Sequence, residues 1–336
     1  MNDGPQQQQP KRRRIRPLLL FLLLVALIAF VVSRPGLHRD IRQSARAVIA
    51  HHLPWSPRDL YALRLRIAGL DESALGTRWR TAVARAGKQP VRVTEAYQTR
   101  AGFAVDGAMA RVYMLSLQRG QRLEWRLART DESDSQLFAS LEHRQPEGDW
   151  DTLAWLEADG RIHHKSIDSN GDYRIVLQPE LFAGPSYRLA IARGGSLPFP
   201  VDGASQRDIG SVFGDPRDNG SREHHGVDIF ADRGTPVHAV ADGRVRTGDS
   251  GIGGKHVWLA SGMLGIGGAR YYYAHLDTIA VDSNDRVAAG DVLGRVGNTG
   301  NARTTPPHLH FGLYTATGPL DPAPFIRPPP QLPDAP

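Results

Sequence analysis

The chain has 336 residues, of which 40% are hydrophobic and 23% charged, a composition typical of folded domains rather than of a disordered chain. Its net charge of +6 is concentrated at the N-terminus. Residues 1–59 carry ten Lys or Arg and three Asp or Glu, which leaves about −1 for the rest and argues against a nucleic-acid-binding face. The absence of cysteine excludes disulfides, a thiol nucleophile and a Cys-ligated zinc site, so any metal must be held by His, Asp or Glu.

The N-terminal segment has the pattern of a membrane anchor. A polar tail is followed by a basic cluster at 11–16, by an uninterrupted apolar run from Leu18 to Val32, and by Arg34. Positive charge before an apolar run keeps the N-terminus in the cytoplasm and sends the rest outward. The run is shorter than the ~20 residues of a comfortable span, and a cleaved signal peptide is the alternative, although no good cleavage site follows. We therefore predict a cytoplasmic tail and transmembrane anchor in residues 1–36, followed by a connector in 37–59.

The central region, residues 60–196, is predicted to be a β-sandwich-like accessory domain. One helix is expected in 71–86, where Trp79 and Val83 lie four residues apart. Short segments, separated by Gly and Asp or Asn turns, then alternate apolar with polar residues, which favours antiparallel strands. They are 91–97, 110–117, 122–127, 137–142, 173–177 and 187–191. His163 and His164 are expected in a solvated turn rather than in a ligand site.

Tryptophans in this central region have two interpretations. Trp125, Trp150 and Trp155 are expected to pack in the core, and a glycan-binding surface is the alternative.

Residues 197–327 begin with a Pro-rich junction at 197–200 and are again predicted to be antiparallel β. Glycine becomes dense, and strands alternate with tight turns at 236–240, 243–247, 256–259, 271–275, 292–296 and 308–314. A Pro-rich tail, residues 328–336, ends the chain. The whole chain is thus expected to be mostly β.

Three histidine segments in this last region carry the candidate chemistry. They are His224–Asp228, Tyr273–Leu276 and Pro307–Phe311. Residues two apart on a strand project from the same face, so His308 and His310 point together while Leu309 and Phe311 face the core. Two imidazoles on one face coexist well when one binds a cation in its neutral form. A His-x-His motif, as at His308 and His310, is common by chance, and so is a His-x-x-x-Asp motif, as at His224 and Asp228. Here both motifs occur in one Gly-rich β region.

A zinc site with an open position follows from these residues. Catalytic zinc takes three N or O ligands from the protein. Asp228 supplies an oxygen, His310 a nitrogen, and His224 a second nitrogen if Gly226 lets the chain bend. His275 and His308 then lie near the water that fills the fourth position.

The same region resembles the lysostaphin-type, or LytM-type, zinc metallopeptidases of peptidoglycan, over about residues 201–326. The resemblance rests on seven blocks in order: Phe213-Gly214, His224–Ile229, Gly234–Val237 with Ala241–Val245, Tyr273–Leu276, Gly290–Gly294, Gly297–Gly300 and Pro307–Phe311. It implies zinc on His224, Asp228 and His310, and catalytic histidines at His275 and His308. Departures at Thr305-Pro306 and in the Gly-rich stretch 263–268 affect substrate preference rather than the metal.

The function implied is a zinc-dependent endopeptidase that hydrolyses peptide cross-links of peptidoglycan. The alternatives are a non-catalytic LytM-like activator and a peptidoglycan-binding scaffold. With the anchor, the resemblance implies a single-pass protein of the inner membrane with its catalytic domain in the periplasm, or a periplasmic protein if the segment is cleaved.

Overall fold

A computed structural model describes residues 56–333 except 108, 250 and 263–267. The chain divides into two compact units, residues 1–68 and 69–336. The predicted anchor in residues 1–36 lies outside the described residues, as does most of the connector. None of the helices that the structure describes has the length and apolar character needed to cross a bilayer.

Helix α3, Pro57–Ile67, forms the described part of the first unit. It begins inside the predicted connector, because Ser56 accepts from the Asp59 amide and Asp59 accepts from the Ser56 amide. This reciprocal cap, with Pro57 at the first helical position, fixes the start of the helix.

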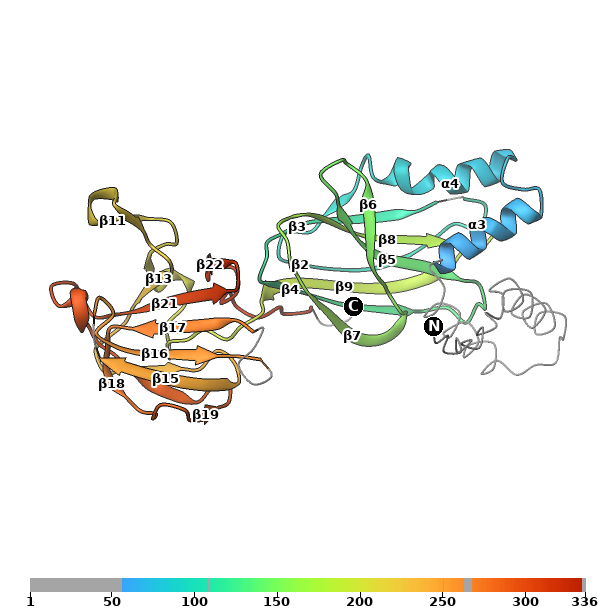
Figure 1. The fold of residues 1–336 in the computed structure, drawn as a ribbon. Coiled ribbons are helices and arrows are strands. Elements are labelled where there is room, and N and C mark those ends of the chain that lie inside the picture. Colours follow the sequence, from blue (N-terminus) through green and yellow to red (C-terminus); the bar gives the residue numbers. More distant parts are fainter. Residues whose placement is uncertain (1–55, 108, 250, 263–267, 334–336) are drawn as a thin grey trace, which may run out of the picture. The chain divides into compact units, whose positions relative to one another are not determined.

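The second unit begins with helix α4, Ala74–Ala86, capped by Ser73. The predicted face is confirmed, because Trp79 and Val83 are both buried. The Trp79 indole donates to the Pro179 carbonyl over 2.8 Å and its ring meets Phe138 edge-on. Helix α4 is therefore fastened to the sheet that contains these residues (Figure 1).

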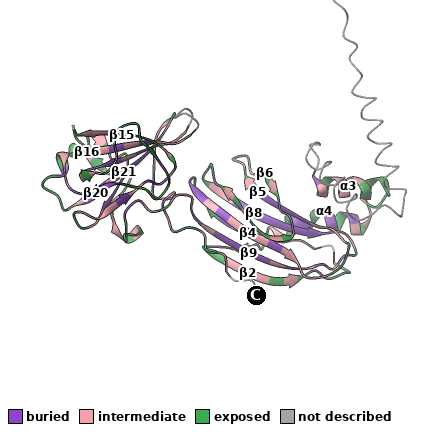
Figure 2. Ribbon diagram, turned by 90° about the horizontal axis from the view of Figure 1, so that it is seen from below, coloured by how far each residue is buried: buried purple, intermediate pink, exposed green. Residues whose placement is uncertain are grey.

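Residues 91–195 form a β-sandwich, as predicted. One sheet has the order β1-β3-β8-β5-β6 and the other the order β2-β9-β4-β7. The strands are β1 Val91–Arg92, β2 Ala96–Gly102, β3 Arg111–Leu117, β4 Gln121–Arg129, β5 Leu137–Arg144, β6 Trp150–Trp155, β7 Asp159–Ser166, β8 Gly171–Pro179 and β9 Ser186–Gly195. Buried residues follow the strands of both sheets (Figure 2).

The core between these sheets is largely apolar and includes a polar contact between two tyrosines. Leu115, Leu123, Ile175 and Leu189 are almost fully buried, and they come from both sheets. The hydroxyls of Tyr113 and Tyr187 meet at 2.9 Å, so two buried polar groups satisfy each other.

Two expectations for the strands of the sandwich were wrong. Residues 91–97 do not form one strand: the chain leaves β1 at Arg92 and enters β2, in the other sheet, at Ala96. His163 and His164 lie on strand β7, where His163 stacks on Trp125 and pairs with Asp159. All residues of β7 are exposed or half-buried, so no clear alternation of apolar and polar residues marks it as a strand in the sequence.

The three tryptophans of the sandwich differ in burial. Trp125 is buried as expected, whereas Trp155 is 38% exposed and Trp150 is half-buried under the Arg174 guanidinium. The prediction that they pack in the core is therefore wrong for Trp150 and Trp155, which lie at the two ends of the edge strand β6.

The C-terminal region contains an eight-stranded and a three-stranded sheet around a core of its own, which includes Val227, Leu259, Leu309 and Phe311. The larger sheet has the order β10-β13-β21-β17-β16-β15-β19, with β22 paired to β21, and the smaller has the order β14-β20-β18. Its strands are β10 Ile209–Ser211, β13 Val227–Phe230, β15 Gly243–Asp249, β16 Lys255–Ala260, β17 Arg270–Ala274, β19 Arg286–Val287, β21 His308–Thr315 and β22 Gly318–Leu320. The smaller sheet contains β14 Pro236–His238, β18 Leu276–Ile279 and β20 Val292–Val296, and a separate hairpin pairs β11 Pro216–Arg217 with β12 Arg222–Glu223.

All six strands predicted in this region are present. The strands not predicted in the two sheets are all short, with two to four residues that carry little alternation: β10, β13, β18, β19 and β22. The glycine-rich stretch 263–268 lies almost wholly outside the described residues.

Candidate metal centre

Two adjacent strands bring the first two candidate ligands together. Asp228 on β13 and His310 on β21 are direct antiparallel partners. Leu309 and Phe311, on the other face of β21, are fully buried in the core. Burial of that face turns His308 and His310 outward, so the alternation of this strand directs His310 toward Asp228.

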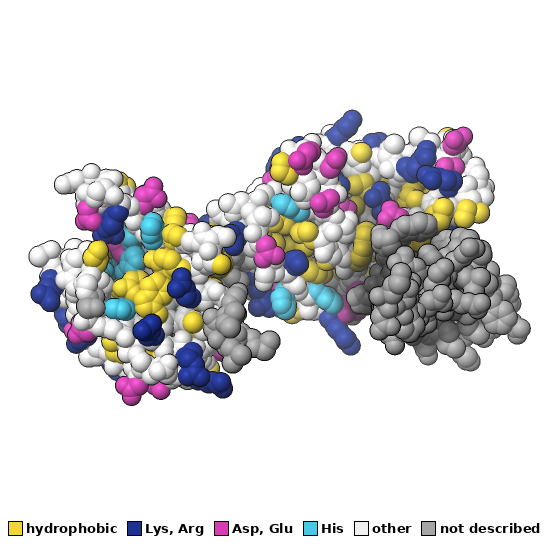
Figure 3. All heavy atoms as spheres, viewed as in Figure 1, with side chains coloured by type: hydrophobic (Ala, Val, Ile, Leu, Met, Phe, Trp, Pro, Cys, Tyr) yellow, Lys and Arg dark blue, Asp and Glu magenta, His cyan; other side chains and the backbone are white. Residues whose placement is uncertain are grey.

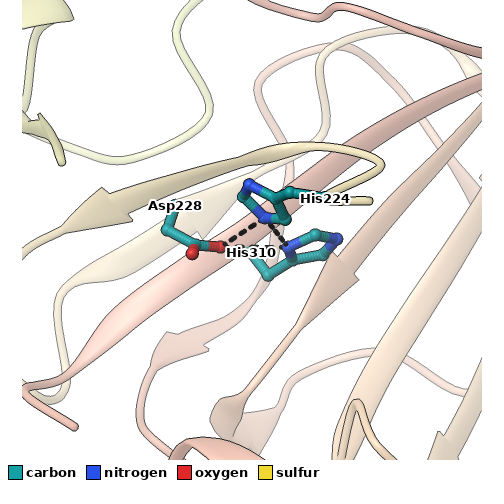
Figure 4. Close-up of side chains that lie close together, drawn as sticks. All are labelled: His224, Asp228 and His310. Carbon is teal, nitrogen blue, oxygen red and sulfur yellow. Dashed lines mark hydrogen bonds and ion pairs between the residues drawn. The ribbon is translucent and has the colours of Figure 1, made fainter. Parts of the chain in front are cut away.

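His224 completes a compact group from the segment before β13. Its Nε2 lies 3.0 Å from Asp228 Oδ1 and 2.9 Å from His310 Nδ1, and His310 Nδ1 lies 3.0 Å from Asp228 Oδ1 (Figure 4). Among the described residues, this is a group of three side chains able to hold a metal ion.

The geometry fits a small cation with nitrogen and oxygen ligands. A tetrahedral zinc with bonds of about 2.0–2.1 Å keeps its ligand atoms about 3.3–3.4 Å apart. The three atoms here are 2.9–3.0 Å apart, so an outward shift of a few tenths of an ångström seats the ion. Three lone-pair atoms this close repel one another unless a proton or a metal ion lies between them, which supports the fit.

The tautomer of His224 is set by the backbone. Its Nδ1 lies 2.8 Å from the Val212 carbonyl, which can only accept, so Nδ1 carries the proton. Nε2 is then the unprotonated nitrogen and faces the centre. A carbonyl behind a ligand imidazole is a usual outer partner in metal sites.

Glycine is required at position 226 because the backbone there lies directly against β21, not because of an unusual backbone angle. A Cβ at this position would lie 2.5 Å from the Phe311 carbonyl and 2.8 Å from the His310 ring. The turn between His224 and β13 therefore passes directly against β21, which brings His224 within reach of Asp228.

Asp228 is buried, which by itself raises the pKa of its carboxyl. Its contacts with the His224 and His310 side chains outweigh burial and hold the pKa of this carboxyl well below its usual range. The carboxyl is thus ionised at neutral pH and suited to bind a cation. Its second oxygen, Oδ2, accepts from Arg217 Nη2 over 2.8 Å.

The two remaining histidines lie beside the three ligand candidates. The rings of His275 and His308 are 5.0 Å apart, and His275 is 6.0 Å from His310. His275 Nδ1 lies 2.9 Å from the Thr299 carbonyl and His308 Nδ1 lies 2.9 Å from the Pro306 carbonyl. Both Nδ1 atoms therefore carry protons, and Nε2 is the lone-pair nitrogen of each ring.

His275 occupies a strained backbone position with φ of 63°. Non-glycine residues rarely adopt this region, and such outliers cluster at functional sites. The chain passes here from β17 of the larger sheet to β18 of the smaller one. Burial, followed by the neighbouring His308, lowers the pKa of His275 to about 4, which keeps its ring neutral at pH 7.

A cleft of about 510 Å³ opens over these side chains. All five candidate histidine and aspartate residues line it, together with Phe230, Tyr272, Asn301, Thr305 and Tyr314. In Figure 3 histidine side chains appear beside an apolar patch of this domain. Tyr272 meets His310 edge-on and stacks obliquely on Trp258, so an aromatic surface adjoins the candidate centre.

The structure brings all five site residues predicted from sequence into one cleft. Two contributors were not predicted, Arg217 beside Asp228 and Tyr272 beside His310. Alternation along β17 offers a signal for Tyr272, because Tyr271 and Tyr273 are buried on the other face. Arg217 is joined to the site by a hairpin, and no sequence periodicity marks it.

Comparisons with known proteins agree with this location. The sequence pattern of peptidase family M23 matches residues 222–322. An L-Ala–D-Glu endopeptidase of Bacillus subtilis is 34% identical over 146 residues, which cover 40% of this chain and 44% of that protein. A DD-carboxypeptidase/endopeptidase of Neisseria meningitidis serogroup B is 36% identical over 115 residues, covering 34% and 25%.

Among solved structures, the catalytic domain of lysostaphin from Staphylococcus simulans is 34% identical, with a TM-score of 0.31. The match covers 34% of this chain and 89% of that domain. The chain spans less than half the length of the two curated relatives named above.

Proposed function

We propose that this chain, which belongs to peptidase family M23 through residues 222–322, is a zinc-dependent endopeptidase that hydrolyses peptide bonds of bacterial peptidoglycan. The convergence of His224, Asp228 and His310 within 3.0 Å of one another, with two more imidazoles in the same cleft, carries the proposal. Relatives named as an L-Ala–D-Glu endopeptidase and a DD-carboxypeptidase/endopeptidase support the substrate class.

His224 Nε2, Asp228 Oδ1 and His310 Nδ1 would hold the ion. When bound, zinc would supply Lewis acidity, which makes water a nucleophile near neutral pH and polarises the scissile carbonyl. Three protein ligands would leave a coordination position open, as catalytic sites require.

His308 and His275 move the protons. A neutral Nε2 can accept the proton of the attacking water, and the resulting imidazolium can donate it to the leaving amine. The partner ring, held through Nδ1 by a backbone carbonyl, can donate to the oxygen on which negative charge develops only when its Nε2 is also protonated. The lowered pKa of His275, about 4, keeps its ring unprotonated at neutral pH but also makes it a weak base.

The substrate bond is a peptide cross-link or stem-peptide bond, and the relatives' names differ on which one. A non-catalytic activator or a scaffold is the alternative function. The presence of all three ligand candidates and both further histidines favours the enzyme, since an activator has no need of them.

The site of action is also proposed. Residues 1–36 would anchor the protein in the inner membrane with the cleft in the periplasm, and signal-peptide cleavage is the alternative. N-terminal sequencing of the mature protein distinguishes them: a start near Arg34 would show cleavage.

The function is tested by incubating the full-length chain, purified in mild detergent because of its apolar N-terminal segment, with peptidoglycan. We expect soluble muropeptides, no release in the presence of a chelator, and recovery on adding zinc. Product masses identify the bond. Unchanged peptidoglycan after incubation with zinc-loaded protein would favour the activator or scaffold.

A further inference from the structure

Arg217 lies on the side of Asp228 opposite the other two ligand candidates. Its Nη2 donates to Asp228 Oδ2 over 2.8 Å and to Ser211 Oγ over 2.5 Å. The Arg217 side chain is 28% exposed and that of Asp228 is 13% exposed, so the ion pair is largely shielded from water. Ser211 in turn donates to Asp215 Oδ2 over 2.8 Å, which fixes the hydroxyl that orients the guanidinium.

The segment that contains Arg217, residues 211–217, also holds His224. The Val212 amide donates to Asp215 Oδ2, and the Val212 carbonyl accepts from His224 Nδ1 over 2.8 Å. The His224 amide donates to the Asp215 carbonyl over 2.9 Å. Residues 211–217 therefore position two of the three ligand candidates, Asp228 and His224, through atoms that face away from the other ligand atoms.

The two oxygens of Asp228 have separate partners. Oδ1 faces His224 and His310, and Oδ2 faces Arg217. A carboxylate with both oxygens free can bind a cation through both, and the second oxygen then takes a position that a catalytic site needs for water or substrate. An arginine on Oδ2 prevents this by occupying its lone pairs.

We infer that Arg217 is a positioning residue that keeps Asp228 a one-oxygen ligand and so keeps one coordination position open. The inference rests on the proposed function, because it needs a metal on His224, Asp228 and His310. It assigns Arg217 no contact with the substrate.

Cobalt(II) is the probe, because it can replace zinc and its visible absorption weakens as its coordination number increases. The test uses the full-length chain in mild detergent, stripped with a chelator and reloaded with Co²⁺ or Zn²⁺. We expect Arg217→Met to bind one ion but to show weaker cobalt absorption than wild type. Its zinc-saturated activity should fall about 10–100-fold, as is typical when an outer partner is lost.

Two further variants separate positioning from charge and from folding. Arg217→Lys keeps a cationic donor for Oδ2 and should recover most of the wild-type absorption. Ser211→Ala removes the contact that orients the guanidinium and should shift the absorption in the same direction as Arg217→Met, by less. These two decide the question if Arg217→Met does not fold.

Arg129→Met is the matched control. Arg129 is 20% exposed and also pairs with an aspartate, Asp131, but in the sandwich. We expect its cobalt absorption and activity to equal those of wild type.

A wild-type cobalt spectrum in both Arg217→Met and Ser211→Ala would overturn the inference, whatever their activity. Failure of wild type itself to bind cobalt or zinc would instead contradict the proposed function.

Discussion

The sandwich and the C-terminal sheet both bury polar side chains, but they use them differently. In the sandwich some of these groups satisfy one another in small separate sets: Tyr113 meets Tyr187, and Glu142 accepts from Arg174 and Ser140. In the C-terminal region, Asp228 alone is contacted by His224, His310 and Arg217. Pairs that satisfy each other inside a core stabilise a fold. Several groups that converge on one point at the floor of a cleft indicate a binding centre.

Among the changes considered, replacing His310 with Ala should cause the largest loss of zinc affinity and activity. It removes one of three ligands, so zinc affinity should fall by more than the roughly 10–100-fold that loss of an outer partner causes, and activity with it. Metal analysis and a muropeptide-release assay on the same sample measure both. A variant that keeps its zinc and its activity would show that the convergence is not a metal site.

Replacing His308 or His275 with Ala should separate proton transfer from metal binding. We expect most of the zinc to remain, because neither residue belongs to the three-ligand group. Activity should drop by about 10²–10⁴-fold if these rings transfer protons. If the His308 variant loses zinc while the His310 variant retains it, the two roles are reversed.

Replacing Glu142 with Ala tests the other side of the comparison. It leaves Arg174 unpaired at a largely buried position, where the side chains of the pair are 13% and 7% exposed. The free energy of unfolding of the sandwich should fall by roughly 3 kcal/mol, measured by urea titration. Zinc content and activity of the folded variant should stay at the wild-type level. A loss of activity in folded, zinc-loaded protein would give the sandwich a part in catalysis.

A smaller effect is expected from pH in chelator-stripped protein. An unfolded histidine has a pKa near 6.5, whereas burial lowers the pKa of His275 to about 4. Between these values the unfolded state binds a proton that the folded state does not, so stability should fall as the pH decreases from 6.5 to 4. His275→Gln should reduce this fall, by on the order of 1–3 kcal/mol. Identical pH profiles for variant and wild type would contradict the buried neutral state.

The sequence was sufficient where local pattern and burial act together. The two-residue alternation of Leu309 and Phe311 against His308 and His310 is local, so it predicts both the strand and its cleft face. Gly226 was expected to allow a bend, but the structure shows that it allows close approach to β21, a contact between distant segments that local pattern does not describe.

Features that depend on long-range packing were missed or mistaken. The break between β1 and β2 arises because the two strands join different sheets, which no property of residues 91–97 reveals. His163 and His164 were placed in a turn because β7 is too exposed to alternate clearly. Arg217 reaches Asp228 only through the hairpin formed with β12, so its role becomes visible only in the fold.

The central claim is that the convergent group around Asp228 is a hydrolytic zinc site. Its most direct test is a zinc titration of the chelator-stripped full-length chain in mild detergent, with muropeptide release from peptidoglycan measured at each point. We expect no release without zinc and a rise that ends at one zinc per chain. Release by the zinc-free protein, or none from protein that carries one zinc, would contradict the claim.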